Sequence, residues 1–179
     1  MEVERRPDGT MILTNARKFD RSYVTMTQAL DRWAVEAPNR TWLAERSGEG
    51  WRELTYGEAR QTIAALAGGL RTLGVVGERP LLILARNTID HALIGYAAMS
   101  LGAPISPVSP QYGLAGADLS RLDFAVQRLK PAAVYVDDAA AFAGALAALG
   151  HGDDAGDHEG EVCEVAAVER HRSEEHTSE

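Results

Sequence analysis

The chain has 179 residues, of which 45% are hydrophobic, and a net charge of -8 at pH 7 with a pI near 5.1. This length supports one domain with a substantial core, or a piece of a larger domain. The acidic balance, without clustered Lys and Arg, argues against a nucleic-acid-binding surface. The single cysteine, Cys163, excludes an internal disulfide, and there is neither a signal peptide nor an apolar run of roughly 18 residues. We therefore predict a cytoplasmic protein without a membrane span.

The first elements expected along the chain are small. Pro7-Asp8-Gly9 has the residue types of a tight turn between two short strands and predicts a hairpin. Thr27 is placed to cap a helix that ends at Pro38. Two further strands, at 41–45 and 51–54, flank a glycine-containing turn and are expected outside the main sheet.

The clearest local signature is Thr55 followed three residues later by Glu58, which is the spacing of a capping box. Apolar residues then recur at three- and four-residue steps until Gly74 and predict a long amphipathic helix. Gly68 and Gly69 lie inside this pattern and not at the end of a strand. We interpret the pair as a close packing contact with the sheet, and a ligand-binding loop is the alternative.

Residues 80–110 predict a strand, a helix and a second strand. The unbroken apolar run 81–85 is typical of a strand buried on both faces. Thr88 can cap the helix that follows, and Gly102 can end it in a left-handed conformation. The next strand, at 103–108, contains regularly spaced prolines, which have no backbone N–H to donate. The strand must therefore lie where those hydrogen bonds are not needed, or it must end early. A crossover of this length indicates parallel strands with helices on their faces.

The same alternation continues beyond this stretch. A helix closed by Lys130-Pro131, a buried strand at 132–136, and an alanine-rich helix capped by Asp137 or Asp138 are expected in turn. From the capping box onward the order is helix, strand, helix, strand, helix, strand, helix. This order predicts an α/β fold, with a doubly wound, mostly parallel sheet that carries helices on its faces and is preceded by a small β-hairpin region.

Few residues have the pattern of a functional site. Arg86 and Asn87 follow the buried strand at the edge where α/β sheets keep their ligands, but we favour a helix-capping turn for them. His91, next to Asp90, is interpreted as a surface or helix-packing histidine and not as a catalytic base. Potential metal ligands in the tail are His151, Asp153, Asp154, Asp157, His158, Glu159 and Cys163. Their spacing matches no defined zinc pattern, and an acidic linker has the same composition, so we assign no catalytic, cofactor-binding or metal-binding residue.

Three runs of residues, in this order, resemble one enzyme family. They are LTYGEA at 54–59, ILARNTIDHALIGYAAMSLGAPISPVSP at 83–110 and QYGLAGADLSRLDFAVQRLKPAAVYVD at 111–137. Together they resemble the beginning of the large domain of AMP-forming acyl-CoA synthetases, in the superfamily of adenylate-forming ligases. PVSPQYGL followed by ADLSRL is most similar to the feruloyl-CoA synthetase group. The resemblance covers roughly residues 3–149.

The resemblance implies an acid–thiol ligase that makes an acyl-adenylate from ATP and a small carboxylic acid, with Mg²⁺, and then an acyl-CoA from coenzyme A. The acid would be ferulate or a related hydroxycinnamate. The sequence contains no counterpart of four parts of the family's site: the phosphate-binding loop, the adenine-binding motif, the ribose-binding aspartate and the C-terminal lysine. It also matches no GxxxxGK[ST] pattern. We therefore expect an inactive fragment that binds ATP, Mg²⁺ and coenzyme A poorly.

The end of the chain adds an expectation about its origin. We expect an incomplete AMP-binding domain at 1–149 and an acidic linker-like or out-of-family tail at 150–171. Residues 172–179 resemble the in-frame translation of a sequencing-library adapter and would then not be biological. The alternatives are a stand-alone α/β ligand-binding module and a truncated gene product without function.

Overall fold

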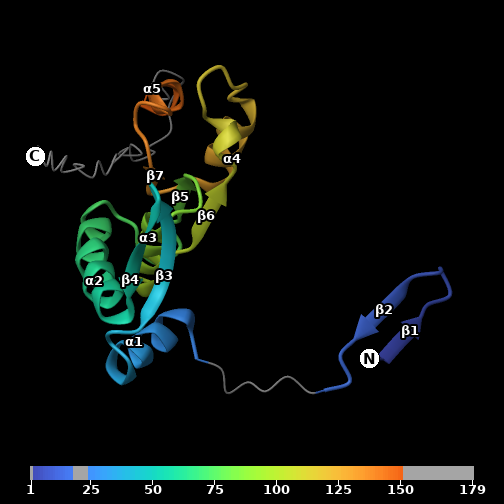
Figure 1. Ribbon diagram of the computed structural model, residues 1–179. Coiled ribbons are helices and arrows are strands. Elements are labelled where there is room, and N and C mark those ends of the chain that lie inside the picture. The colour runs from blue at the N-terminus through green and yellow to red at the C-terminus, as the bar shows by residue number, and fades with distance from the viewer. Residues whose placement is uncertain (1, 18–23, 151–179) are drawn as a thin grey trace, which may run out of the picture.

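The centre of the fold is a parallel β-sheet. The computed structural model describes residues 2–17 and 24–150. Within them, β5 (Leu81–Leu84), β6 (Ile105–Val108) and β7 (Ala133–Val136) form a three-stranded sheet (Figure 1). The strand order is β6-β5-β7, and both pairs are parallel. The predicted crossover between two parallel strands is therefore confirmed, and β5 is the middle strand.

β5 is buried on both faces, as its apolar run predicts. Each of its four residues is at most 1% exposed. Since side chains alternate along a strand, Leu81 and Ile83 face one side of the sheet, and Leu82 and Leu84 face the other. The two pairs belong to two separate clusters of buried side chains. The strand therefore joins the two halves of the core.

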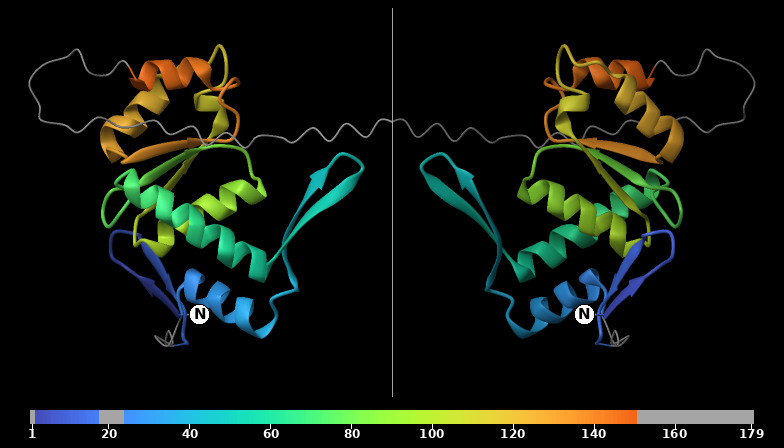
Figure 2. Two further views of the ribbon diagram at one scale, coloured as in Figure 1. Left: turned by 90° about the vertical axis from the view of Figure 1, so that its left-hand side faces the viewer. Right: turned by 90° about the vertical axis from the view of Figure 1, so that its right-hand side faces the viewer.

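The described residues contain five α-helices: α1 (Met26–Glu36), α2 (Tyr56–Thr72), α3 (Ile89–Ser100), α4 (Ser120–Leu129) and α5 (Ala143–Gly150). The first three contribute to the cluster on the face of Leu81 and Ile83, and the last two to the cluster on the face of Leu82 and Leu84. Figure 2 shows the green helices α2 and α3 on one side of the strands and the yellow and orange helices α4 and α5 on the other. None of the helices in this part of the chain has the length and apolar character needed to cross a membrane.

The sheet is doubly wound. The crossover from β5 to β6 passes over one face through α3, and the crossover from β6 to β7 passes over the other face through α4. Because such crossovers are right-handed, a change of face reverses the direction in which the chain moves across the sheet. That reversal explains why β6 and β7 flank β5 on opposite sides. The predicted fold class is confirmed.

Two antiparallel hairpins accompany the parallel sheet. β1 (Glu2–Arg5) pairs with β2 (Met11–Thr14), and β3 (Thr41–Ser47) pairs with β4 (Gly50–Thr55). Each pair is a two-stranded sheet of its own, so both predicted hairpins are confirmed and both lie outside the main sheet. The prolines of the predicted strand at 103–108 are also accommodated, because β6 lies at an edge of the sheet formed by the described residues and the short 3-10 helix η1 (Pro110–Tyr112) begins two residues after it.

The predicted capping signals of α2 and α3 are confirmed. Thr55 Oγ1 accepts a hydrogen bond from the Glu58 backbone N–H (3.3 Å), and the Glu58 carboxylate accepts one from the Thr55 N–H (2.9 Å). Thr88 Oγ1 accepts a hydrogen bond from the N–H three residues further on (3.1 Å). Beyond the two helices, Gly74 and Gly102 have φ angles of 73° and 72°, the left-handed conformation that favours glycine.

The prediction that Thr27 caps α1 is wrong. Thr25 is the cap: its hydroxyl oxygen accepts a hydrogen bond from the Gln28 N–H (3.2 Å), and the Gln28 side chain accepts one from the Thr25 N–H (2.9 Å). Thr25 completes a capping box because the residue three positions later is a glutamine. The corresponding residue for Thr27 is Leu30, which is buried in the core and has no polar group.

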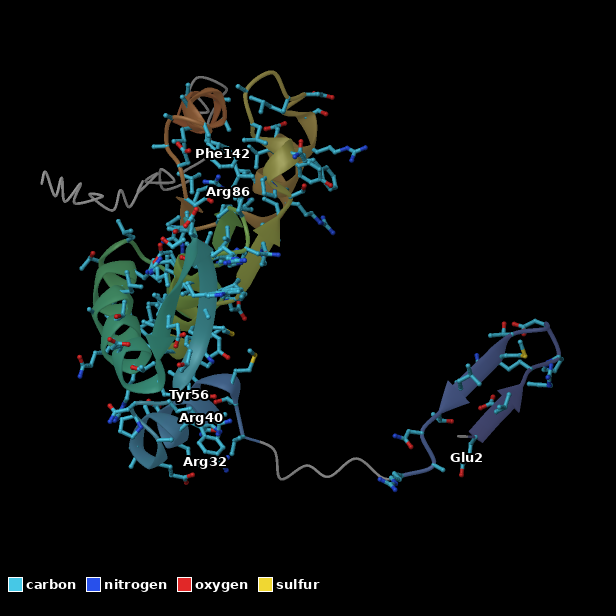
Figure 3. The ribbon with its side chains drawn as sticks, viewed as in Figure 1. Glu2, Arg32, Arg40, Tyr56, Arg86 and Phe142 are labelled. Atoms are coloured by element: carbon cyan, nitrogen blue, oxygen red, sulfur yellow. The ribbon has the colours of Figure 1, made fainter. Side chains whose placement is uncertain are left out.

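The interpretation of Gly68 and Gly69 as a packing contact is also wrong. A Cβ added at either position would meet no atom within 4 Å, and both residues are exposed on α2. The close approach occurs instead at Gly113, after η1. A Cβ there would lie 2.6 Å from Leu84 Cδ2 and 3.2 Å from Phe142 Cδ1, both in the core on the α4–α5 face. Figure 3 shows Phe142 between the ribbons of α4 and α5.

Alanine substitutions at these glycines should therefore have opposite effects. Gly68→Ala replaces a glycine in an open helical position and should raise the free energy of unfolding by about 0.5–1 kcal/mol. Gly113→Ala overpacks the core and should lower it by about 1–3 kcal/mol. Urea unfolding of the two variants measures both values. A destabilised Gly68→Ala variant would restore the packing interpretation.

Candidate functional site

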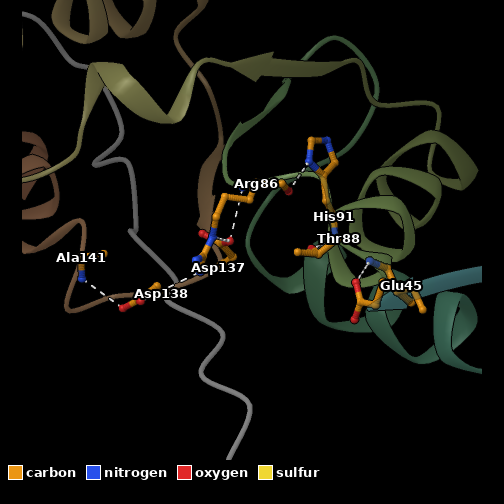
Figure 4. Close-up of polar contacts among 8 residues, drawn as sticks. Glu45, Arg86, Thr88, His91, Asp137, Asp138 and Ala141 are labelled. Carbon is orange, nitrogen blue, oxygen red and sulfur yellow. Dashed lines mark hydrogen bonds and ion pairs between the residues drawn. The ribbon is translucent and has the colours of Figure 1, made fainter. Parts of the chain in front are cut away.

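The best-defined polar cluster lies where β5 and β7 end. The two strands are parallel neighbours, with Leu84 opposite Val136, so the residues that follow them meet at the same edge of the sheet. Arg86 follows β5, and Asp137 and Asp138 follow β7. Figure 4 shows Arg86 extending toward Asp137, with Asp138 beside this pair and bonded to Ala141. In open α/β sheets, this carboxyl edge is where ligands bind.

Arg86 and Asp137 form a close ion pair. The Arg86 Nε donates to Asp137 Oδ2 (2.6 Å), and the Arg86 backbone N–H donates to the same oxygen (3.3 Å). The Asp137 side chain is 7% exposed, whereas that of Arg86 is 65% exposed. The hydrogen bond and negative charge of Asp137 raise the pKa of the Arg86 guanidinium above its usual value. The pair joins the ends of two strands whose residues are distant in the sequence.

The acidic residues of this cluster do not cap α5, contrary to the prediction. Asp137 is engaged with Arg86, and Asp138 Oδ1 accepts a hydrogen bond from the Ala141 N–H (3.0 Å) in a turn that precedes the helix. The helix itself begins only at Ala143. Asp138 Oδ2 also lies 4.0 Å from Arg86 Nη2. The single cation therefore faces two carboxylates.

One buried oxygen of the cluster lacks a donor. Asp137 Oδ1 has no hydrogen-bond partner among the residues that the structure describes. A buried polar atom without a partner costs free energy, and most such atoms in native proteins are satisfied. Oδ1 of Asp137 can therefore accept one further hydrogen bond.

The turn between β5 and α3 is held by its own residues and by the β3–β4 hairpin. His91 Nδ1 lies 3.1 Å from the Arg86 carbonyl oxygen, so the ring contacts the turn that precedes its own helix (Figure 4). Glu45 Oε2 accepts a hydrogen bond from the Ile89 N–H (2.7 Å). Arg52 bridges Glu45 (2.8 Å) and Asp90 (3.0 Å). The hydrogen bonds that Arg52 donates to Asp90 and Glu45 raise the pKa of its guanidinium above its usual value.

A cavity of about 310 Å³ lies between this hairpin and the start of α3. It is lined by Leu43, Ala44, Glu45, Asn87, Thr88, Ile89, His91 and Ala92. The sequence placed Asn87 at the carboxyl end of a strand and His91 on the helix that follows, and both line this cavity. It did not identify Glu45 or Arg52 as their neighbours, because no local pattern relates residues of the hairpin to those of α3.

The metal-binding hypothesis for the tail falls on His151, Asp153, Asp154, Asp157, His158, Glu159 and Cys163, which lie outside the described residues. Within residues 2–17 and 24–150, no three His, Cys, Asp or Glu side chains come together as a metal site would require. The charged groups at the carboxyl edge are paired with one another. Their arrangement is suited to holding strand ends together.

A doubly wound parallel sheet with helices on both faces defines an α/β protein. The family model described as AMP-binding enzyme matches residues 30–178. Because this match covers most of the chain, the protein belongs to the AMP-binding enzyme family.

Several solved structures have a similar fold. The fatty acid AMP ligase from Legionella pneumophila is 19% identical with a TM-score of 0.56, over 62% of this chain and 19% of that one. NpsA from Klebsiella oxytoca, in complex with 3-hydroxyanthranilyl-AMSN, is 16% identical with a TM-score of 0.56. The match covers 79% of this chain and 24% of that one. IdnL1 is 23% identical with a TM-score of 0.51, and the match covers 62% of this chain and 22% of that one. At these identities the likeness shows the fold alone.

The chain spans about a fifth to a quarter of the length of these structures. A search of curated proteins found no significant match.

Loss of Arg86 should destabilise the sheet because it leaves the buried Asp137 carboxylate without its main partner. We expect Arg86→Ala to lower the free energy of unfolding by about 1–3 kcal/mol. The matched control is Arg60→Ala, which removes an ion pair with Asp31 that is exposed at both ends (54% and 58%), and it should cost less than about 1 kcal/mol. Chemical denaturation measures both, and equal effects would contradict a structural role for the Arg86–Asp137 pair.

Proposed function

We propose that the chain is the first part of an ATP-dependent carboxylate–CoA ligase that acts on ferulate or a related hydroxycinnamate. The family match over residues 30–178 carries the general part of this proposal. The choice of acid is supported by PVSPQYGL and ADLSRL, which resemble feruloyl-CoA synthetases. In the structure these residues run from the end of β6 through η1 into α4, beside the carboxyl edge of the sheet.

One of the similar structures also supports an aromatic acid. The Klebsiella oxytoca NpsA complex contains a 3-hydroxyanthranilyl group. That group, like feruloyl, is a hydroxylated aromatic acyl group. The Legionella pneumophila enzyme, by contrast, is a fatty acid ligase, so the shared fold is compatible with very different acids. The motif at η1 is therefore the feature that favours ferulate.

The residues present do not fit ATP, Mg²⁺ or coenzyme A by themselves. The lysines of the sequence are Lys18 and Lys130, and neither follows a glycine-rich loop. Lys130 adopts a left-handed conformation at the C-cap of α4. Arg86, the cation at the carboxyl edge, already faces Asp137 and Asp138. We therefore assign this chain the role of scaffold, and we derive no catalytic step through these groups.

Activity assays test this proposal with two polypeptides. The 179-residue chain should show no ferulate-dependent release of pyrophosphate from ATP and no feruloyl-CoA formation. The polypeptide encoded by the longest reading frame through this sequence should show both, and neither in the absence of the acid. Turnover by the 179-residue chain above a mock preparation would contradict the assigned role. Activity of the longer polypeptide with fatty acids but not with ferulate would contradict the choice of substrate.

A further inference from the structure

The cavity of about 310 Å³ between the β3–β4 hairpin and the start of α3 has the size of a small ligand site. Ligand pockets in proteins have volumes of roughly 300–1,000 Å³, so this cavity suits a molecule with a single ring. Its apolar lining comes from two separate elements: Leu43 and Ala44 belong to β3, and Ile89 and Ala92 belong to α3. Such a lining favours a ligand with an apolar body.

The carboxylate in the lining already has its partners. Glu45 Oε2 accepts a hydrogen bond from the Ile89 N–H (2.7 Å), and Glu45 Oε1 accepts one from Arg52 (2.8 Å). Both oxygens thus have a donor, and Arg52 supplies the opposite charge. A charged ligand would lose water in the cavity without gaining a free counter-charge, and an anion would also be repelled by Glu45. The cavity therefore favours a neutral ligand.

His91 contributes a hydrogen-bond acceptor to the lining. Its Nδ1 lies 3.1 Å from the Arg86 carbonyl oxygen (Figure 4). Because a carbonyl oxygen only accepts, Nδ1 carries the proton, and Nε2 of the neutral ring is then an acceptor. Nε2 has no hydrogen-bond partner among the described residues, and it is not one of their buried atoms. It is therefore open to a donor from a ligand.

We propose that this cavity binds a small neutral ring compound with a hydroxyl group, of the phenol class. The hydroxyl group donates to His91 Nε2, and the ring packs against Leu43, Ile89 and Ala92. The volume determines the single ring, the bonded state of Glu45 determines the lack of charge, and the free His91 nitrogen determines the donor. The inference does not depend on the proposed ligase activity or on its substrate.

Titration of the full chain with phenol and with benzoate, followed by nuclear magnetic resonance, tests the proposal. Phenol should cause saturable shifts of the amide signals of Leu43 and Ala92, which lie in the lining. Benzoate brings a negative charge next to Glu45 and should bind about tenfold more weakly or less. Absence of saturable shifts with phenol, or equal affinities for the two compounds, would overturn the proposal.

The role of His91 is tested by comparing phenol with toluene, which has a similar ring but no donor. His91→Phe keeps a ring in the lining and removes the acceptor. The ratio of phenol affinity to toluene affinity should therefore fall by about three- to tenfold in this variant, the equivalent of one hydrogen bond. An unchanged ratio would contradict the assignment of Nε2 as the acceptor.

A second variant tests the place of binding. Ala92→Leu fills the cavity with a larger side chain and should abolish the saturable shifts with phenol and with toluene. The matched control is Ala64→Leu, which makes the same change at an exposed position of α2 and should leave both affinities unchanged. Binding that persists in Ala92→Leu, or is lost equally in the control, would overturn the proposal. The titrations of the unaltered chain stand without either variant.

Discussion

The burial of β5 on both faces is the constraint on which the rest of the structure depends. A strand of four apolar residues with neither face exposed to solvent requires a neighbouring strand on each side and helices packed on each face. β6 and β7 provide the flanks. Leu81 and Ile83 anchor one cluster of side chains, and Leu82 and Leu84 anchor the other. The carboxyl edge follows from this arrangement, because the polar turns after β5 and β7 must then meet.

The sequence predicts those elements whose signals act within a few residues. The apolar run predicts the strand β5, and the Thr55–Glu58 capping box predicts the start of α2. Each signal is sufficient on its own, because it depends only on residues next to one another in the sequence. Prediction failed where two neighbouring signals compete: Thr25 and Thr27 are both acceptable caps, and only the partner three residues later distinguishes them. It failed again at Gly68, because a helical pattern does not indicate which glycine touches the sheet.

The polar cluster could be predicted only in part. The sequence places Arg86 at the carboxyl edge, but its pairing with Asp137, 51 residues away, depends on the strand order β6-β5-β7. The contacts of Glu45 with the start of α3 depend on the position of a separate hairpin. The family could be predicted because several motifs occur in the right order, and each is tied to a structural element. The acyl substrate rests on one short stretch near η1 and stays a prediction.

The central claim is that β5 makes the two halves of the core unfold together. The most direct measurement is urea unfolding of Leu82→Ala followed by tryptophan fluorescence. Leu82 faces α4 and α5, whereas Trp42 packs in the opposite cluster. A single cooperative core predicts that this variant lowers the free energy of unfolding reported by the tryptophans by about 2–5 kcal/mol. An unchanged fluorescence transition would contradict the claim, because the cluster around Trp42 would then be independent of the opposite face of the sheet.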